Sequence, residues 1–162
     1  MGENSKIEWC DNTFNPWIGC QKVAIDCDRC YAETQNAFRK WNGGTWGPHA
    51  PRKRTSDDNW KNPIKWNKEA EAFKEERGYN PRVFCASLAD VFDNQVPTKW
   101  REELFDLIRA CNRLDWLLLT KRPQNIAQML PADWGNGYSN VWLGMSAGDQ
   151  PNFCLLYTSR CV

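Results

Sequence analysis

Two short apolar runs, Arg82-Val83-Phe84-Cys85-Ala86-Ser87-Leu88 and Asp115-Trp116-Leu117-Leu118-Leu119-Thr120, decide the fold of this 162-residue chain. Continuous apolar runs of this length, bounded by turn residues, are typical of strands buried on both faces of a parallel sheet. A third such run covers residues 140–146. Helical periodicity fills the intervals, with Thr98 as the predicted N-cap of the helix between the first two strands. This alternation predicts a parallel α/β sheet built by right-handed crossovers.

The chain before the first of these strands has a less regular pattern. Its first thirty residues predict a short strand and a loop, and residues 31–41 have the spacing of one helical face. Residues 42–62 are rich in Gly, Pro and charge, which predicts an irregular insertion on the surface. A second helix is predicted over residues 64–77, closed by Gly78.

Composition narrows the class of protein. With 41% hydrophobic residues and ten tryptophans, the chain has enough apolar surface to form one hydrophobic core. This composition excludes a chain that is a disordered tail. The net charge of +1 argues against a surface that tracks phosphates along its whole length. No apolar run is long enough to cross a bilayer, and residues 1–6 do not have the basic-then-apolar layout of a secretory signal. We therefore expect a cytoplasmic protein that does not contact membranes.

Polar side chains follow each predicted strand, at the edge of a parallel sheet where ligands usually bind. Any one of them could instead cap a helix or solvate a loop. Three polar ends on the same rim favour a shared pocket, and two adjacent cations suit an anion such as a carboxylate or a phosphate. The candidate residues are Ser87, Asp90, Lys121, Arg122 and Ser146.

Three of the eight cysteines, Cys20, Cys27 and Cys30, form a C-x6-C-x2-C pattern. A closed zinc site needs four ligands, and the only nearby candidates for the fourth are Cys10 and His49. Three thiolates without a fourth suit a 4Fe–4S cluster that leaves one iron open to another ligand. The spacing alone leaves iron–sulfur and zinc as alternatives.

The remaining cysteines have simpler interpretations. Cys85 and Cys111 lie among apolar residues and are predicted to be small core side chains. Residues 153–162 follow no expected pattern, and we interpret them as a non-native tail after a single domain spanning residues 1–152. His49 is predicted to be a loop residue without a catalytic role.

Several segments resemble a known family when they are read in order. They are Lys6-Ile7-Glu8-Trp9, Asn15-Pro16-Trp17-Ile18-Gly19-Cys20, Cys27-Asp28-Arg29-Cys30-Tyr31-Ala32-Glu33, Val83 to Phe92, Leu118 to Pro123, and Val141 to Ser146. Together they resemble the phage gene-product thirty-seven/sixty-eight family, whose function is unassigned and whose three-cysteine motif is radical-SAM-like. The resemblance covers about residues 5 to 150.

The resemblance implies a partial TIM-like barrel of parallel strands, a radical-SAM-like domain truncated at its C-terminus. The cysteines would bind three irons of a 4Fe–4S cluster, and S-adenosylmethionine would chelate the fourth. Reduction by a one-electron donor would then release a 5′-deoxyadenosyl radical that acts on an unknown substrate. Tyr31 would shield the cluster or serve as a core aromatic, while Ser87 and Asp90 would accept from the cofactor's ammonium group.

Two other functions remain open on the sequence. In the first, Cys10 joins the three cysteines to close a structural zinc site. In the second, the chain binds nucleic acid through the basic run Arg52-Lys53-Arg54 and the nearby Trp46 and Trp60, because bases stack on aromatic rings beside cations. The second function is compatible with radical chemistry on a base.

Overall fold

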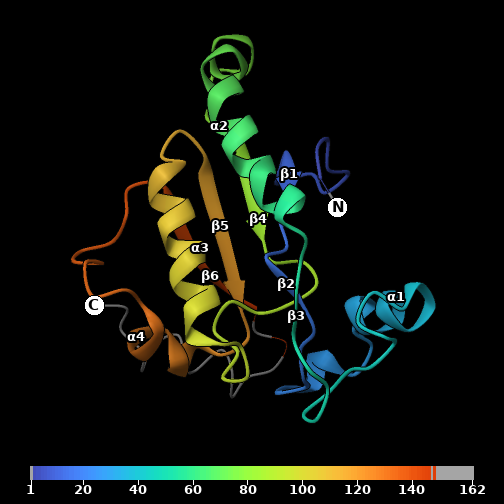
Figure 1. Ribbon diagram of the computed structural model, residues 1–162. Coiled ribbons are helices and arrows are strands. Elements are labelled where there is room, and N and C mark those ends of the chain that lie inside the picture. The colour runs from blue at the N-terminus through green and yellow to red at the C-terminus, as the bar shows by residue number, and fades with distance from the viewer. Residues whose placement is uncertain (1, 147, 149–162) are drawn as a thin grey trace.

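Four parallel strands form the main sheet, in the order β1-β4-β5-β6 (Figure 1). They are β1 (Asn12–Thr13), β4 (Arg82–Cys85), β5 (Asp115–Thr120) and β6 (Val141–Met145). The computed structural model describes residues 2–146 and 148. The predicted parallel α/β sheet is confirmed, and within these residues the sheet is open and does not close into a barrel.

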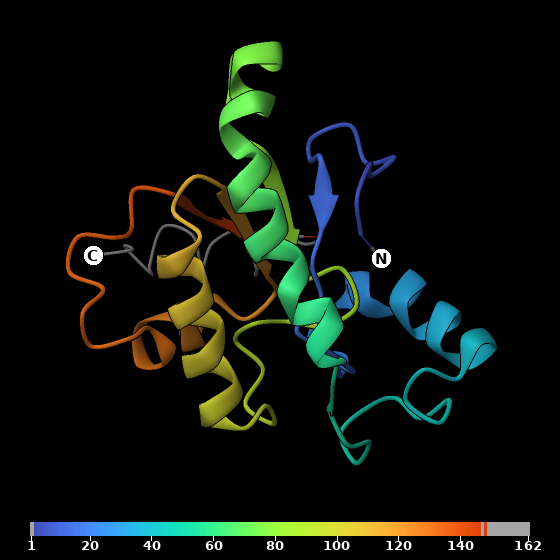
Figure 2. The same cartoon turned by 45° about the horizontal axis from the view of Figure 1, so that its top comes forward.

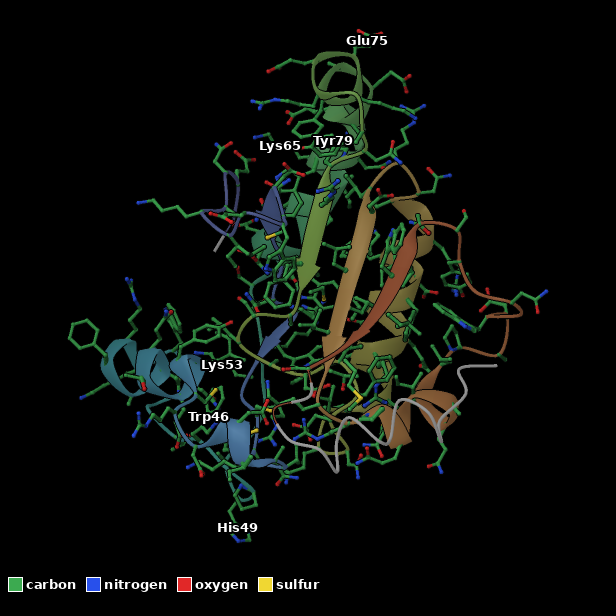
Figure 3. All side chains as sticks on the ribbon, turned by 180° about the vertical axis from the view of Figure 1, so that it is seen from behind. Trp46, His49, Lys53, Lys65, Glu75 and Tyr79 are labelled. Atoms are coloured by element: carbon green, nitrogen blue, oxygen red, sulfur yellow. The ribbon has the colours of Figure 1, made fainter. Side chains whose placement is uncertain are left out.

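Two helices pack against one face of this sheet, α2 (Asp57–Arg77) and α3 (Thr98–Ala110) (Figures 1 and 2). Alternate strand residues point into this core: Val83 and Cys85 from β4, and Trp116 and Leu118 from β5, all fully buried. The period of two places the alternate residues, such as Phe84 and Leu119, on the opposite face. Seen from behind, β4, β5 and β6 lie in front of these helices (Figure 3).

The carboxyl ends of the strands point toward a group of smaller elements (Figure 1). An antiparallel pair, β2 (Trp17–Ile18) and β3 (Lys53–Arg54), lies beside the sheet. The 3-10 helix η1 (Ile25–Cys27) and α1 (Tyr31–Arg39) follow β2, and η2 (Pro123–Asn125) with α4 (Ile126–Met129) follows β5. The helix predicted after residue 30 is confirmed, and it ends at Arg39. Before it the structure has two short strands and a 3-10 helix, where the sequence predicted one short strand and a loop.

The predicted starts of two helices are wrong, and β4 ends at Cys85, before the end of the apolar run that predicted it. The helix predicted from residue 64 begins at Asp57, so the last six residues of the predicted 42–62 insertion are helical. Pro63 lacks an amide hydrogen, which suggested a helix break. Its ring instead joins a buried stripe with Trp60, Trp66 and Ala70, and this packing outweighs one missing hydrogen bond. Thr98 is the first helical residue of α3 rather than its N-cap, which is Pro97.

Replacing Ser56 by alanine should lower the free energy of unfolding by about 1 kcal/mol, because Ser56 caps α2. Its Oγ accepts a hydrogen bond from the amide of Asn59 at 3.3 Å. Urea denaturation followed by circular dichroism measures the change. Ser56→Asp keeps an acceptor at the same position and should retain the stability. An equal loss in both variants would show that the serine acts through something other than capping.

Two further predictions concern membrane crossing and the C-terminal residues. In the range 2–146 together with 148, no helix has both the length and the apolar character that a bilayer crossing requires. The predicted non-native tail, with Cys154 and Cys161, lies outside the described residues.

Candidate functional site

A cavity of about 820 Å³ opens at the carboxyl ends of the strands. Residues predicted from quite separate parts of the sequence line it. They are the three motif cysteines, Cys20, Cys27 and Cys30, and all six side chains expected to bind a cofactor, Tyr31, Ser87, Asp90, Lys121, Arg122 and Ser146. The fold therefore brings the cysteine motif and the polar strand ends to one place.

The three cysteines reach the cavity from consecutive short elements. Cys20 follows β2, Cys27 ends η1, and Cys30 is the N-cap of α1. Cys27 is buried, whereas Cys20 and Cys30 are partly exposed. Within the described part of the chain, no three thiol, imidazole or carboxylate side chains are grouped closely enough to hold a single metal ion. A 4Fe–4S cluster makes a different demand, because each thiolate binds its own iron.

Asn15 joins the loop before the cysteines to the loop after β4. Its side chain is fully buried, and its amide donates to Ser87 Oγ at 2.9 Å while its carbonyl accepts from the Leu88 amide at 2.7 Å. The Gly19 amide donates to the Leu88 carbonyl at 3.1 Å. Gly19 has φ +117°, which favours glycine, and a Cβ there would lie 3.1 Å from Arg52 Cδ. These contacts fix the position of Cys20 relative to the sheet.

Tyr31 makes a second link between the cysteine region and β4. Its hydroxyl donates to the Ser87 carbonyl, and its ring lines the cavity while remaining about half exposed. Burial of the hydroxyl raises the pKa of Tyr31 above its usual value. Of the two roles considered for this side chain, a core aromatic is therefore wrong. The ring lies beside Cys30 at the cavity wall.

Arg122 is buried and connects the end of β5 to Cys20. Its guanidinium donates to Asp90 Oδ2 at 2.9 Å, to the Gln21 carbonyl at 3.1 Å and to Cys20 Sγ at 3.5 Å. Burial raises the pKa of Cys20, and the charge of Arg122 opposes part of this rise. Because these three partners already occupy the guanidinium, the role of Arg122 is to hold Cys20 in position.

The carboxylate of Asp90 is likewise occupied by hydrogen bonds within the protein. Its carboxylate accepts from the Thr120 hydroxyl at 2.8 Å, from the Phe92 amide at 2.9 Å and from the Lys121 amide at 3.1 Å, besides the guanidinium of Arg122. Four donors on one buried carboxylate satisfy it fully. In this arrangement Asp90 has a positioning role at the cavity wall, and the ammonium group expected to bind it would have to displace one of these donors.

Lys121 and Ser146 present the more accessible polar groups. Lys121 Nζ donates to Ser146 Oγ at 3.1 Å and lies 3.5 Å from Asp26 Oδ2. About a third of the lysine side chain is exposed. This group combines a cation, a hydroxyl and a carboxylate at the cavity wall, and it can therefore hold a ligand that carries both an anion and a cation.

The zinc alternative requires Cys10, which the structure places elsewhere. Cys10 is buried, donates from its Sγ to Ser5 Oγ at 3.4 Å, and is not among the residues that line the cavity. His49 also lies outside the cavity lining and projects from its loop (Figure 3). Cys85 and Cys111 are core side chains, as predicted, and burial raises the pKa of Cys111 to about 11.

The basic run Arg52-Lys53-Arg54 does not form an open cationic surface. Arg52 is buried and pairs with Asp93, its Nε lying 2.7 Å from Oδ2. Arg54 lies 4.2 Å from the centre of the Trp60 ring and pairs with Glu103. Trp60 itself is buried. Tertiary packing therefore uses both arginines and Trp60, and these three side chains do not present the exposed stacking surface that the nucleic-acid alternative expected of them.

Several cavity residues were not found from the sequence. Asp26 occurs in a segment without periodicity, and nothing in its spacing indicates a shared site. Trp41, Gln35 and Arg39 also line the cavity, as does Trp46, which the sequence indicated only as a base-stacking candidate near the basic run. The only sequence signal for Gln35 and Arg39 was their helical spacing from Tyr31, which puts all three on one face of the helix.

Comparison with known proteins finds a match to one family, whose function is unknown. A family model described as "Protein of unknown function (DUF5131)" matches residues 4–154. No curated protein and no solved structure matches the chain.

Proposed function

Since the chain belongs to the DUF5131 family, whose function is unknown, we propose its function from the site itself: it is a radical-SAM-like iron–sulfur protein. Cys20, Cys27 and Cys30 hold three irons of a 4Fe–4S cluster, and S-adenosylmethionine binds beside it. The observation that carries the proposal is the single cavity shared by these cysteines and the polar strand ends. When bound, the cluster supplies one electron that cleaves the sulfonium bond of S-adenosylmethionine and starts radical chemistry on a substrate.

The donor set fits such a cluster. Three thiols from one short segment line a common cavity, and among the residues that the structure describes the lining adds no histidine and no fourth cysteine. An iron left without a protein ligand can take the amino and carboxylate groups of an amino acid. Lys121 lies on the cavity wall, where it would donate to the carboxylate, and Asp26 lies beside it, where it would accept from the N–H groups of the amino group.

The arrangement of strands supports a partial TIM-like barrel as the finer description of the fold. Neighbours in the sheet follow chain order, from β1 through β4 and β5 to β6, as in a singly wound barrel. The helices α2 and α3 cover one face, while Phe84 and Leu119 line the cavity from the other. In barrels of this class the reaction takes place at the carboxyl ends of the strands.

This chain's own residues orient the site and limit its access to water. Arg122 fixes Cys20 against the buried Asp90 carboxylate, and Asn15 fixes the loop that carries Ser87. Trp9 and Phe84, whose ring centres lie 4.7 Å apart, form an apolar part of the wall. An apolar wall suits radical chemistry because it disfavours competing reactions with solvent.

Anaerobic reconstitution of the full chain with iron and sulfide tests the proposal. We expect about four irons per chain and a brown absorbance. After reduction with dithionite as the one-electron donor, S-adenosylmethionine should change the paramagnetic resonance spectrum by binding the open iron. One tightly held zinc and a colourless protein would contradict the proposal and favour a structural metal module. A cluster that does not respond to S-adenosylmethionine would contradict the radical-SAM part.

A further inference from the structure

The cavity continues along α1, well beyond the cysteines. Tyr31, Gln35 and Arg39 recur at intervals of four residues, so they share one face of the helix, and all three line the cavity. With a rise of 1.5 Å per residue, this row extends about 12 Å from the cysteine end. Trp41 and Trp46 line the cavity beyond it. The cavity therefore has an outer part with chemistry of its own, formed by Gln35, Arg39, Trp41 and Trp46.

Polar contacts hold the loop that carries the two indoles of this outer part. Asn36 is fully buried, donates to the Thr45 carbonyl at 2.8 Å and accepts from the Asn42 amide at 2.9 Å. Lys53 Nζ donates to the Trp41 carbonyl at 2.8 Å. Both indoles also pack against a small core made of Ile18, Ala32 and Leu88. The loop that carries them thus presents pre-organised aromatic surfaces, which lowers the entropic cost of binding a ring.

Arg39 supplies a cation at the same place. Its guanidinium lies 5.4 Å from the centre of the Trp41 ring, and no acidic side chain among the described residues pairs with it. The arginines of the basic run differ from it in this respect, because Arg52 and Arg54 both pair with carboxylates. Arg39 is therefore available to an anion from the ligand.

These groups select one chemical class of ligand. Indole and guanidinium planes stack on heteroaromatic bases, an arginine pairs with phosphate, and a glutamine amide can both donate to and accept from a base edge. We propose that the outer part of the cavity binds a single nucleotide unit, with its base against Trp41 or Trp46 and its phosphate at Arg39. The net charge of +1 agrees with recognition of one unit rather than of a long phosphate backbone.

This proposal rests on the proposed function for the reactive end of the cavity, since it names the substrate class of that same site. A nucleotide held by the outer part would extend its base or sugar toward the cysteines. The nucleotide could be free or part of a single strand, and both sources present the same base and phosphate.

Calorimetry with the metal-free full chain tests the binding. The probes are the four ribonucleoside monophosphates, short single-stranded DNA and RNA oligonucleotides, and an abasic oligonucleotide of the same length. We expect saturable binding of a nucleotide or an oligonucleotide and much weaker binding of the abasic strand. Whichever of the two binds more tightly identifies the source. If neither binds, or if the abasic strand binds equally well, the proposal is overturned.

Two variants separate a specific phosphate contact from general charge. Arg39→Gln should weaken binding about tenfold, which corresponds to about 1.4 kcal/mol. Lys40→Asn removes the same charge from the adjacent exposed residue, whose positive φ of 52° asparagine tolerates, and should change binding less than about twofold. An equal loss in both variants would overturn the proposal. Circular dichroism checks that both variants fold.

Competition with S-adenosylmethionine distinguishes a separate nucleotide site from an extension of the cofactor site. The nucleotide should stay bound in its presence, because the cofactor occupies the cysteine end. If S-adenosylmethionine displaces the nucleotide and Arg39→Gln weakens both ligands equally, the outer part belongs to the cofactor and the proposal is overturned. Failure of nucleotide binding leaves the expected iron content unchanged, and failure of cluster assembly leaves binding by the metal-free chain unchanged, so the two failures are distinguishable.

Discussion

Replacing Cys27 by alanine is expected to reduce the iron content of the reconstituted chain from about four atoms to almost none. The thiol of Cys27 lines the cavity from the end of η1, between the other two cysteines of the motif. A cluster held by only two thiolates is easily lost, because the missing ligand leaves a second iron open to solvent and chelators. Iron and sulfide analysis, together with the visible spectrum, measures the loss.

Cys85→Ala is the matched control, since it removes a thiol that is fully buried in the core on the other side of β4. It should lower stability through a small packing defect and leave the iron content unchanged. Cys10→Ala tests the zinc alternative in the same assay. Iron retained by Cys27→Ala, or lost equally from Cys85→Ala, contradicts the ligand assignment. Loss of a bound zinc from Cys10→Ala would favour the four-cysteine site.

Much of the sheet could be predicted because its strands are nearly continuous apolar runs. The run from Asp115 to Thr120 forms β5 with the predicted bounds, and it lies between β4 and β6, so both of its edges are hydrogen-bonded. Its burial is less complete than predicted, because Leu117 and Leu119 on one face are only partly buried. The start of α2 was harder to predict. Pro63 and the charged residues before it favour a loop locally, and only the packing of Trp60 and Trp66 against the sheet, a tertiary effect, makes this segment helical.

The inner part of the site could also be predicted, for a topological reason. Parallel strands bring their carboxyl ends to one edge, so polar residues such as Ser87, Lys121 and Ser146 meet although they lie far apart in the sequence. Their partners could not be predicted in the same way. The contact between Arg122 and Cys20 joins residues 102 positions apart, and no local pattern encodes it. The outer part depends on the loop that carries Trp41 and Trp46. The sequence placed Trp41 at the end of a predicted helix and named Trp46 only for its closeness to the basic run, so it did not indicate that the two indoles share a cavity.

Arg122→Met should lower the free energy of unfolding by about 3–5 kcal/mol, the usual cost of removing one partner of a buried ion pair. Asp90 and Arg122 are both almost fully buried, and the variant leaves the Asp90 carboxylate without its cation. The Gln21 carbonyl and Cys20 Sγ lose their donor at the same time. Urea denaturation of the metal-free chain measures the change without any contribution from a cluster.

Lys121→Met provides the comparison, because it removes the same charge from the adjacent residue. Its ammonium group is partly exposed and lies 3.5 Å from Asp26, so its loss should cost less than about 1 kcal/mol. The double variant Asp90→Asn, Arg122→Met removes both charges and should recover part of the stability, since the uncompensated carboxylate causes most of the loss. Equal, small losses in Arg122→Met and Lys121→Met would show that the buried pair does not stabilise the fold. In that case Arg122 would be retained for its contact with Cys20, and its replacement should alter the reduction potential of a bound cluster more than the stability of the chain.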